Sequence, residues 1–534
     1  MDYVKSKFTE TLPKVNQAVA GFARRELNKA ASMISLIWKE CAEPSFPDCI
    51  KYDGCQICSP EQSAKILTEH LSSKNKVELS RSDVCVYAFN FLLTEPDGNV
   101  SKISSYLTLP HCFDDSNDLI IKGTNKTISP VVSDMVFSRV NNGIFVPFTR
   151  DRLTFEKIEY IYLVNGVPEN SILSHCNIHH YCKTNANKST TRPKTTLAHY
   201  LFARWGFYET FERYFDFKSG DMHLFTDLNA AKAALSEDEW DFFYSYGYSP
   251  KKTRGYVPCK TTIAIRKEKV TESVKLIVAG FFYVADIFPD DYSNIGWIEG
   301  KDLWVRSLGN IIHKDEPNSR KIHLSTTNHL NSLDQYLDGY MKQKIEEIDL
   351  YHENFYDFIF HMIENMADLL ITLNPASLDN KKLSCLDYVL LDVIKSIFNF
   401  TYSLEKTNVL DRKTVAQRIS KYIPRDIATN YNKHGEVSTM SFPGDCLYFK
   451  LTTSLISQTE ATSKTTRSKL GLSDSSRCLT ATLLGVTSPL AQTKPKPEGN
   501  SKLGIFAQLD SRYRFFRDEA LQKIVDETQA KINL

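Results

Sequence analysis

The spacing of apolar residues in the first third of the chain predicts strands joined by short turns. Val84–Leu93 is rich in β-branched and aromatic residues, and the turn sequence Pro96-Asp97-Gly98-Asn99 follows it, which is typical of a β-hairpin. Leu119-Ile120-Ile121 has the composition of a buried strand, and Thr127-Ile128-Ser129 resumes an extended run after a turn. The pattern predicts a β-rich unit over residues 80–140, followed by a further strand at 143–148.

Longer elements are expected after residue 150. Phe355, Ile359, Met362 and Met366 recur at helical spacing. The apolar run Leu276–Phe288 is interrupted by an aspartate, is too short to span a bilayer, and is interpreted as a core strand. The other expected elements are helices at 1–40, 60–71, 197–217, 230–246 (capped by Ser236), 334–372, 386–400 and 511–531, strands at 261–266, 274–288 and 445–456, and irregular chain at 41–60. With 534 residues, this mixture indicates an α+β fold with several domains.

Charge is balanced over the whole chain, so any nucleic-acid-binding surface must come from local clustering. Lys and Arg number 65 against 64 Asp and Glu, a net charge of +1. The Ser/Thr-rich stretch 457–504 is basic, with only Glu460, Asp474 and Glu498 opposing its cations. Long cationic side chains on a hydroxyl-rich segment suit phosphate contacts. We therefore predict nucleic-acid binding by Lys464, Arg467, Lys469, Arg477, Lys494, Lys496 and Lys502, with a solvated loop as the alternative.

The twelve cysteines are expected to be reduced, because Met1–Arg25 lacks the apolar segment of a secretory signal. Two groups could instead bind zinc, which needs four ligands in a tetrahedron. One is Cys41, Cys49, Cys55 and Cys58, where only the last two have Cys-x2-Cys spacing, and the other is Cys176, His179, His180 and Cys182. Neither has a regular zinc-fold signature, so structural cysteines are preferred and no metal ligand is assigned.

A hydrolytic site at His111, Asp114, Asp115 and Asp118 is a weaker alternative. Carboxylates in turns usually accept hydrogen bonds from the local backbone. No nucleophilic residue follows at a spacing that would indicate a catalytic site. No catalytic residue is therefore assigned, and an enzyme acting alone is not expected.

Leu109-Pro110 is followed by Ile120-Ile121-Lys122-Gly123-Thr124-Asn125-Lys126-Thr127-Ile128-Ser129. This segment resembles the I-I-N-G-T-E-R-x-I-x-S segment in the N-terminal half of the β subunit of multisubunit DNA-directed RNA polymerases. Leu410–Val415 is similar to the tail of a second β segment, although that segment's acid-acid-His front is missing. Ser488–Thr493, followed by Leu503-Gly504, resembles the N-P-L-(S/A)-E-x-T and L-G of the β fork region. The three segments occur in the family's order.

The resemblance implies an N-terminal, split β-like subunit of the kind found in RNA polymerases of giant bacteriophages, in which the β chain ends where a larger protein would continue. The implied domains are a first protrusion part at 1–148, a lobe at 149–400, a second protrusion part at 401–455, and a fork-like loop region with a C-terminal helix at 456–534. Gly485 or Val486 stands where the family has an acid, and Lys494-Pro495-Lys496 replaces its His-Lys-Arg-Arg core. Rifampicin is therefore expected to bind poorly.

In the β family the catalytic Mg²⁺ is held by β′ aspartates. This sequence has neither an Asp-x-Asp-x-Asp run nor a Gly-rich phosphate loop. The resemblance thus implies nucleotidyl transfer only in an assembled complex, with Mg²⁺ bound by a partner chain. The implied partners are a C-terminal β-like subunit, β′-like subunits, a promoter-specificity subunit, template DNA and the RNA–DNA hybrid, without a membrane.

The expected location is the host bacterial cytoplasm during infection, or the virion. Two other functions stay open at this point. A phage structural or interaction protein without a nucleic-acid role is favoured by the neutral charge and by 26 Tyr and 31 Phe. A zinc-stabilised nucleic-acid-binding protein is the other.

Overall fold

The chain forms two compact units, and unit 2 is inserted into the sequence of unit 1. Unit 1 comprises Met1–Val136, Asp338–Leu350 and Asn374–Leu534, and unit 2 comprises Phe137–Leu337 and Tyr351–Leu373. The computed structural model describes residues 21–72, 82–95, 97–113, 118–121, 123–128, 131–140, 142–150, 152–176, 178, 195–247, 258–313, 318–374, 377–405, 407, 410–423, 437–438, 456–457, 481–484, 486, 500–501, 508–517 and 519–532. The α+β class and the multi-domain organisation are confirmed, whereas the assignment of protrusion, lobe and fork stays a prediction.

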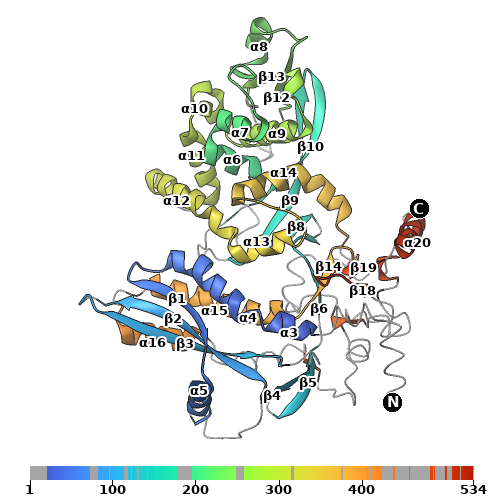
Figure 1. Ribbon diagram of the computed structural model, residues 1–534. Coiled ribbons are helices and arrows are strands. Elements are labelled where there is room, and N and C mark those ends of the chain that lie inside the picture. The colour runs from blue at the N-terminus through green and yellow to red at the C-terminus, as the bar shows by residue number, and fades with distance from the viewer. Residues whose placement is uncertain are drawn as a thin grey trace. The chain divides into compact units, whose positions relative to one another are not determined.

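Unit 1 is built on an antiparallel sheet of β1 (Ile50–Ile57), β2 (Val84–Thr94) and β3 (Val100–Pro110) (Figure 1). The predicted hairpin is present, with Thr94 paired to Val100 across the turn. The expectation of irregular chain at 41–60 is wrong, because β1 pairs with β2. A register shift interrupts this pairing at Gly54, whose φ of +103° suits glycine. That bulge breaks the two-residue period by which a strand is recognised.

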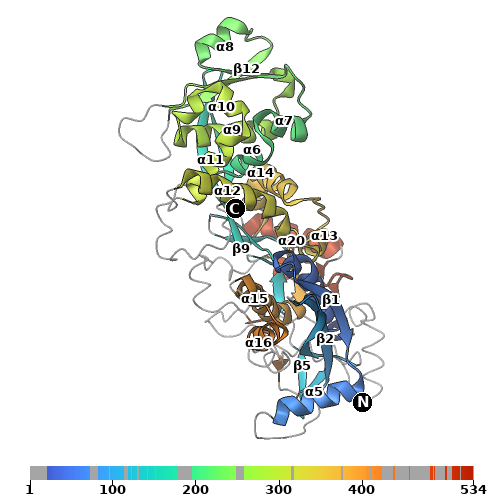
Figure 2. The same cartoon turned by 90° about the vertical axis from the view of Figure 1, so that its left-hand side faces the viewer.

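Helices pack on unit 1's sheet from both ends of the chain. Figure 2 shows α15 (Leu386–Glu405) and α16 (Arg412–Tyr422) side by side. The other helical elements in the described part of unit 1 are α3 (Phe22–Leu27), α4 (Ala30–Leu36), the π-helix η1 (Ile37–Ala42), η2 (Glu43–Ser45), α5 (Pro60–Ser72), α13 (Gly339–Glu346), η8 (Ala481–Leu483) and α20 (Glu519–Ile532). Helices expected at 1–40, 60–71 and 386–400 are therefore present in the described parts of those ranges.

Short strands join distant parts of unit 1. One sheet has the order β14 (Lys381–Ser384), β6 (Val131–Asp134), β16 (Ile456–Ser457), β17 (Asn500–Ser501). A second has the order β15 (Val437–Ser438), β5 (Thr124–Ile128), β4 (Asp118–Ile121), and β18 (Gln508–Leu509) pairs with β19 (Phe515–Phe516). Residues 511–531 are thus helical only from Glu519, since the start of that range belongs to the β18–β19 hairpin.

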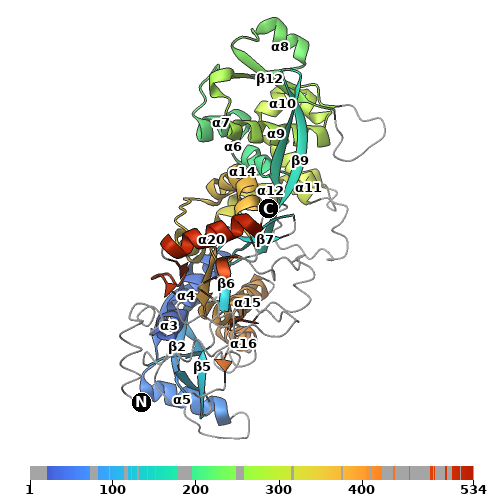
Figure 3. The same ribbon diagram turned by 90° about the vertical axis from the view of Figure 1, so that its right-hand side faces the viewer.

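Unit 2 contains an antiparallel sheet with helices packed against it. Figure 3 shows the long strand β9 (Arg152–Val164) beside α9 (Glu272–Ile287). The sheet order is β11-β13-β12-β9-β8-β7, and β10 also pairs with β9. The other strands are β7 (Ser138–Val140), β8 (Gly143–Pro147), β10 (Val167–His175), β11 (Met222–Phe225), β12 (Trp240–Ser245) and β13 (Thr262–Arg266). The strands predicted at 143–148 and 261–266 are confirmed.

The remaining helices of unit 2 lie around α9 and the sheet. They are α6 (Leu197–Trp205), α7 (Phe207–Phe215), α8 (Leu228–Ala234), η4 (Lys267–Lys269), η5 (Asp291–Ser293), α10 (Ile295–Glu299), α11 (Lys301–Ile312), α12 (Ser319–Ser332), η6 (Leu333–Tyr336) and α14 (Phe355–Thr372). The helix expected over 197–217 is divided at Gly206, whose φ is +100°. The range 334–372 contains η6, α13 and α14 rather than one or two long helices.

Two further assignments of secondary structure are wrong. The strand predicted at 274–288 is the helix α9, which begins where the Thr271 hydroxyl accepts a hydrogen bond from the Val274 N–H at 3.3 Å. Burial on all sides removes the helical period from its sequence. The helix predicted at 230–246 ends at Ala234, and β12 follows because Trp240–Ser245 pairs with both β9 and β13.

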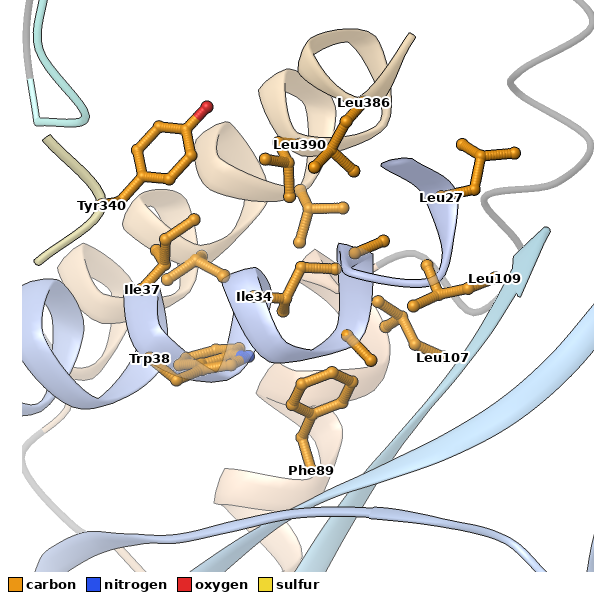
Figure 4. Close-up of a cluster of buried hydrophobic side chains, with 14 of the residues drawn as sticks. Leu27, Ile34, Ile37, Trp38, Phe89, Leu107, Leu109, Tyr340, Leu386 and Leu390 are labelled. Atoms are coloured by element: carbon orange, nitrogen blue, oxygen red, sulfur yellow. The ribbon is translucent and has the colours of Figure 1, made fainter. Parts of the chain in front are cut away.

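Trp38 is fully buried in unit 1's core, beside Ile34 and Ile37 (Figure 4). Its ring centroid is 5.0 Å from that of Phe91 on β2 and 5.7 Å from that of Phe400 on α15, both with edge-on geometry. Leu107 and Leu109 on β3 and Leu386 and Leu390 on α15 are buried in the same cluster. Residues before and after the insertion of unit 2 therefore share one core, and burying aromatic rings in this way is strongly stabilising.

Candidate nucleic-acid interface

Two strands that are paired with each other flank most of the basic stretch 457–504, which we call the basic tract. All seven predicted nucleic-acid-binding residues, Lys464, Arg467, Lys469, Arg477, Lys494, Lys496 and Lys502, lie outside the described residues. The flanking strands are described: Ile456 pairs with Ser501 and Ser457 with Asn500, antiparallel. The two strands on either side of residues 458–499 are therefore neighbours in one sheet.

β6 connects this sheet to the segment that resembles polymerase β. Ser457 pairs with Val131 in parallel, and β14 pairs with β6 on its other side. The Lys381 ammonium lies 2.5 Å from the Asp134 carboxylate across β14 and β6, and the lysine side chain is 7 % exposed. The strand after Ser129 thus holds two segments that lie more than 240 residues further along the chain.

The segment Ile120–Ser129 contains a tight hairpin, as predicted. Ile121 pairs with Thr124 across the turn, and Gly123 has φ +73°. Leu119 and Ile121 are buried. The Asp83 carboxylate accepts a hydrogen bond from the Ile120 N–H at 2.8 Å, which fixes the hairpin to the start of β2.

Residues just before the third β-like segment belong to the core of unit 1. Val486 is 1 % exposed within that core, where an unpaired carboxylate would be costly. Upstream, the Thr482 hydroxyl accepts a hydrogen bond from the Leu378 N–H at 3.0 Å. The Arg517 guanidinium donates to the Thr482 carbonyl and lies 2.6 Å from the Asp379 carboxylate. Residues 481–486 are therefore held in place from two sides.

Arginines near the C-terminal hairpin have structural partners. Arg512 donates to the Asp349 carboxylate at 2.9 Å and to the Glu347 carbonyl at 2.9 Å. Arg514 donates to Asp510 at 2.6 Å. These side chains connect the C-terminal segment to the residues after α13. Their hydrogen bonds are therefore made within unit 1. The sequence pattern contained no signal for them, because their partners are far away in the chain or belong to irregular segments.

The second β-like segment, Leu410–Val415, is the start of helix α16. The Asp411 carboxylate accepts a hydrogen bond from the Thr414 N–H at 2.8 Å. A hydrogen bond from the Thr414 hydroxyl, followed by this N–H bond, lowers the pKa of Asp411. Asp411 is therefore an N-cap residue. Arg412 and Lys413 follow it in the first turn and are exposed.

In the part of the chain that the structure describes, neither the residues of the zinc alternative nor those of the hydrolase alternative form a site. Among the described residues, no three His, Cys, Asp or Glu side chains gather closely enough to hold a metal ion. Cys41 donates to Asp338 at 3.0 Å, and burial raises the pKa of Cys55 to about 11. Cys176 is buried, while its proposed co-ligands His179, His180 and Cys182 lie outside the described residues.

His111 is half-buried, and burial lowers its pKa. Its ring packs edge-on against Phe113 with centroids 4.7 Å apart. Asp114 and Asp115 lie outside the described residues, as does the side chain of Asp118. The hydrolytic grouping is therefore not observed in the part of the chain that the structure describes.

These observations define a two-unit α+β protein in which two paired strands flank most of the basic tract. The model of the family described as "Non-virion RNA polymerase subunit" matches residues 3–529, and the chain belongs to this family. It is accordingly a subunit of a phage RNA polymerase that is distinct from a virion polymerase, it has a role in transcription in the infected cell, and other polymerase subunits are its partners. No curated protein matches the chain. None of the described helices is long and apolar enough to cross a membrane.

Proposed function

We propose that this subunit is the N-terminal, β-like part of the polymerase and forms one wall of its DNA channel. The observation that carries the proposal is the path of the chain in unit 1. After the insertion of unit 2, β14 and β16 pair with β6, and β15 pairs with β5. A β-type protrusion interrupted by a lobe requires this order, in which the returning chain pairs beside the strands that precede the insertion.

In this role the basic tract contacts the phosphates of template DNA and of the RNA–DNA hybrid. Its cations neutralise backbone charge, and counterion release makes such binding salt-dependent. Nucleotidyl transfer itself takes place in the assembled polymerase, at Mg²⁺ bound by a partner chain. The promoter-specificity subunit and the C-terminal β-like and β′-like subunits complete the complex.

The composition of the purified polymerase tests the proposal directly. A tag on this chain should retain separate subunits, including one with an Asp-x-Asp-x-Asp loop, and the eluate should transcribe DNA. If the chain elutes alone while transcription activity elutes without it, the proposal is wrong. If the partners include a complete, unsplit β subunit, the β-like role is wrong although the chain remains a polymerase subunit.

A second experiment addresses the DNA-channel role. Lys494→Ala together with Lys496→Ala should weaken template holding and reduce transcription at elevated salt without unfolding the chain. The matched control is Lys39→Ala with Lys51→Ala, two exposed lysines of unit 1 far from the tract in sequence. Equal salt sensitivity in both double variants and the wild type would exclude phosphate contacts by Lys494 and Lys496.

A further inference from the structure

Helix α16 departs from the balanced charge of the chain. Its sequence RKTVAQRISKY contains four basic residues and no acidic residue. Val415 and Ile419 are buried in the core of unit 1 and fix the orientation of the helix. The opposite face carries Lys413, Gln417 and Lys421, all exposed, with the half-buried Arg418 beside them. We call these four residues the α16 basic face.

The α16 basic face forms a straight row. Lys413, Gln417 and Lys421 are spaced four residues apart, so their side chains follow one another along the same side of the helix. With a rise of about 1.5 Å per residue, the row spans roughly 12 Å. Because the inner side of the helix is packed in a core, the spacing of these groups is fixed before any ligand binds.

Salt bridges do not account for these charges, and helix stability accounts only for Lys421, which lies in the last turn where a cation is favourable. Within the described residues, Lys413, Arg418 and Lys421 form no salt bridge. Lys413 acts electrostatically on its neighbour Asp411, and Lys421 lies 5.3 Å from the ring centroid of its neighbour Tyr422. Arg412 and Lys413 occupy the first turn, where the helix dipole disfavours a cation. Asp411 already caps the helix, so the helix gains nothing further from positive charge at this end.

We propose that the α16 basic face binds the phosphate backbone of double-stranded DNA. Duplex DNA carries a negative charge about every 1.7 Å along its axis, so a rigid row of roughly 12 Å can meet a phosphate at each cation. Gln417 adds a neutral hydrogen-bond donor between the two lysines, as is common in backbone contacts. The contact is independent of base sequence, since no side chain of the row needs to enter a groove.

This inference deepens the proposed function, because it gives the DNA-channel role a contact surface outside the basic tract. The test uses the purified polymerase containing this subunit and a labelled duplex of arbitrary sequence. Binding is measured by anisotropy over a series of salt concentrations. The test variant is Lys413→Gln/Arg418→Gln/Lys421→Gln, and the matched control is Lys39→Gln/Lys51→Gln/Lys65→Gln, whose three exposed lysines lie on separate elements of unit 1.

The test variant should reduce the slope of log Kobs against log salt by about 0.9 for each lost phosphate contact, up to roughly 2.7. The control should leave the slope within error of the wild type. Lys413→Arg/Lys421→Arg should retain the wild-type slope, because the charge is kept. Circular dichroism of each variant checks that α16 remains folded.

The outcomes separate this inference from the proposed function. If the test variant is folded and its slope equals that of the control, the α16 basic face does not bind DNA, while loss of slope in Lys494→Ala/Lys496→Ala would leave the channel role standing. If the substitutions reduce the salt slope for binding of single-stranded RNA but leave the slope for duplex DNA unchanged, duplex DNA is not the ligand of the α16 basic face. If the chain does not copurify with transcription activity, the proposed function fails first.

Discussion

Lys381 and Asp134 face each other across β14 and β6, with the ammonium 2.5 Å from the carboxylate. The lysine is almost fully buried, and the aspartate side chain is 31 % exposed. The pair joins the strand just before the insertion of unit 2 to the strand just after it. The ion pair can therefore form only when the chain that follows unit 2 has paired with β6 in unit 1.

Replacing Lys381 by alanine should destabilise unit 1 by about 1.5–3 kcal/mol, since a partly buried carboxylate loses its charged hydrogen-bond partner. Urea unfolding followed by tryptophan fluorescence would measure this loss. The control is Lys102→Ala, which removes an exposed pair with Asp53 whose side chains are 50 % and 36 % exposed and should cost no more than about 1 kcal/mol. Equal effects of the two substitutions would show that the Lys381 pair adds nothing beyond an ordinary surface pair.

Gly280 should resist substitution, although alanine is normally the better helix former. A Cβ at Gly280 would lie 2.6 Å from the Ala198 Cβ, where α9 and α6 approach closely. Gly280→Ala should therefore destabilise unit 2, by about 1–3 kcal/mol as is typical of overpacking. Gly296→Ala on α10 meets nothing closer than 3.6 Å and should be neutral or stabilising, by up to about 1 kcal/mol. Thermal melting compares the two, and a stabilising Gly280→Ala would contradict the close approach.

His199 should make unit 2 sensitive to acid. Burial lowers its pKa to about 3 and keeps the ring neutral, although the contact with the Trp304 carbonyl partly opposes this shift. Nε2 lies 3.2 Å from the Trp304 carbonyl oxygen and Nδ1 lies 2.6 Å from the Thr195 hydroxyl. Between the unfolded pKa near 6.5 and the folded value, the unfolded chain binds more protons, so the free energy of unfolding falls as pH falls.

Lowering the pH from 7 to 5 should remove about 2 kcal/mol through His199 alone. His361 adds to the same trend, since burial lowers its pKa to about 4. Urea midpoints at several pH values would measure the slope, and His199→Asn should flatten it. A stability that is independent of pH between 7 and 5 in the wild type would contradict the buried neutral ring.

Rifampicin should fail to inhibit transcription by the purified polymerase. The acid expected at the drug pocket is replaced near Val486, which is buried in the core of unit 1, and the basic core of the segment is reduced to Lys-Pro-Lys. A dose–response series with a bacterial polymerase as the sensitive control would measure this. Inhibition of both enzymes at equal concentrations would show that the β-like alignment of Ser488–Thr493 is wrong.

Local patterns in the sequence were sufficient for some elements and misleading for others. The hairpin at Gly123 and the long strand β2 could be predicted because turn residues and β-branched runs are local signals. The helix α9 could not, because a segment buried on every side has no polar face to reveal its period. The same distinction applies to the candidate site. The N-cap at Asp411 depends on residues three positions apart and can be predicted from the sequence. The pairing of β16 with β6 joins residues more than 300 positions apart and cannot.

The core of unit 1 has a consequence for synthesis of the protein on the ribosome. Trp38, Phe91 and Leu107 need partners on α15 and α16, which are translated only after the whole of unit 2. At about 5–20 residues per second, the β1–β2–β3 sheet waits roughly 15–60 s with α4 and η1 packed on it but without the apolar side chains of α15 and α16. Unit 2 can complete its sheet and most of its helices during this interval. Nascent chains of this subunit are therefore expected to engage host chaperones before release, and shortage of those chaperones should limit the yield of polymerase.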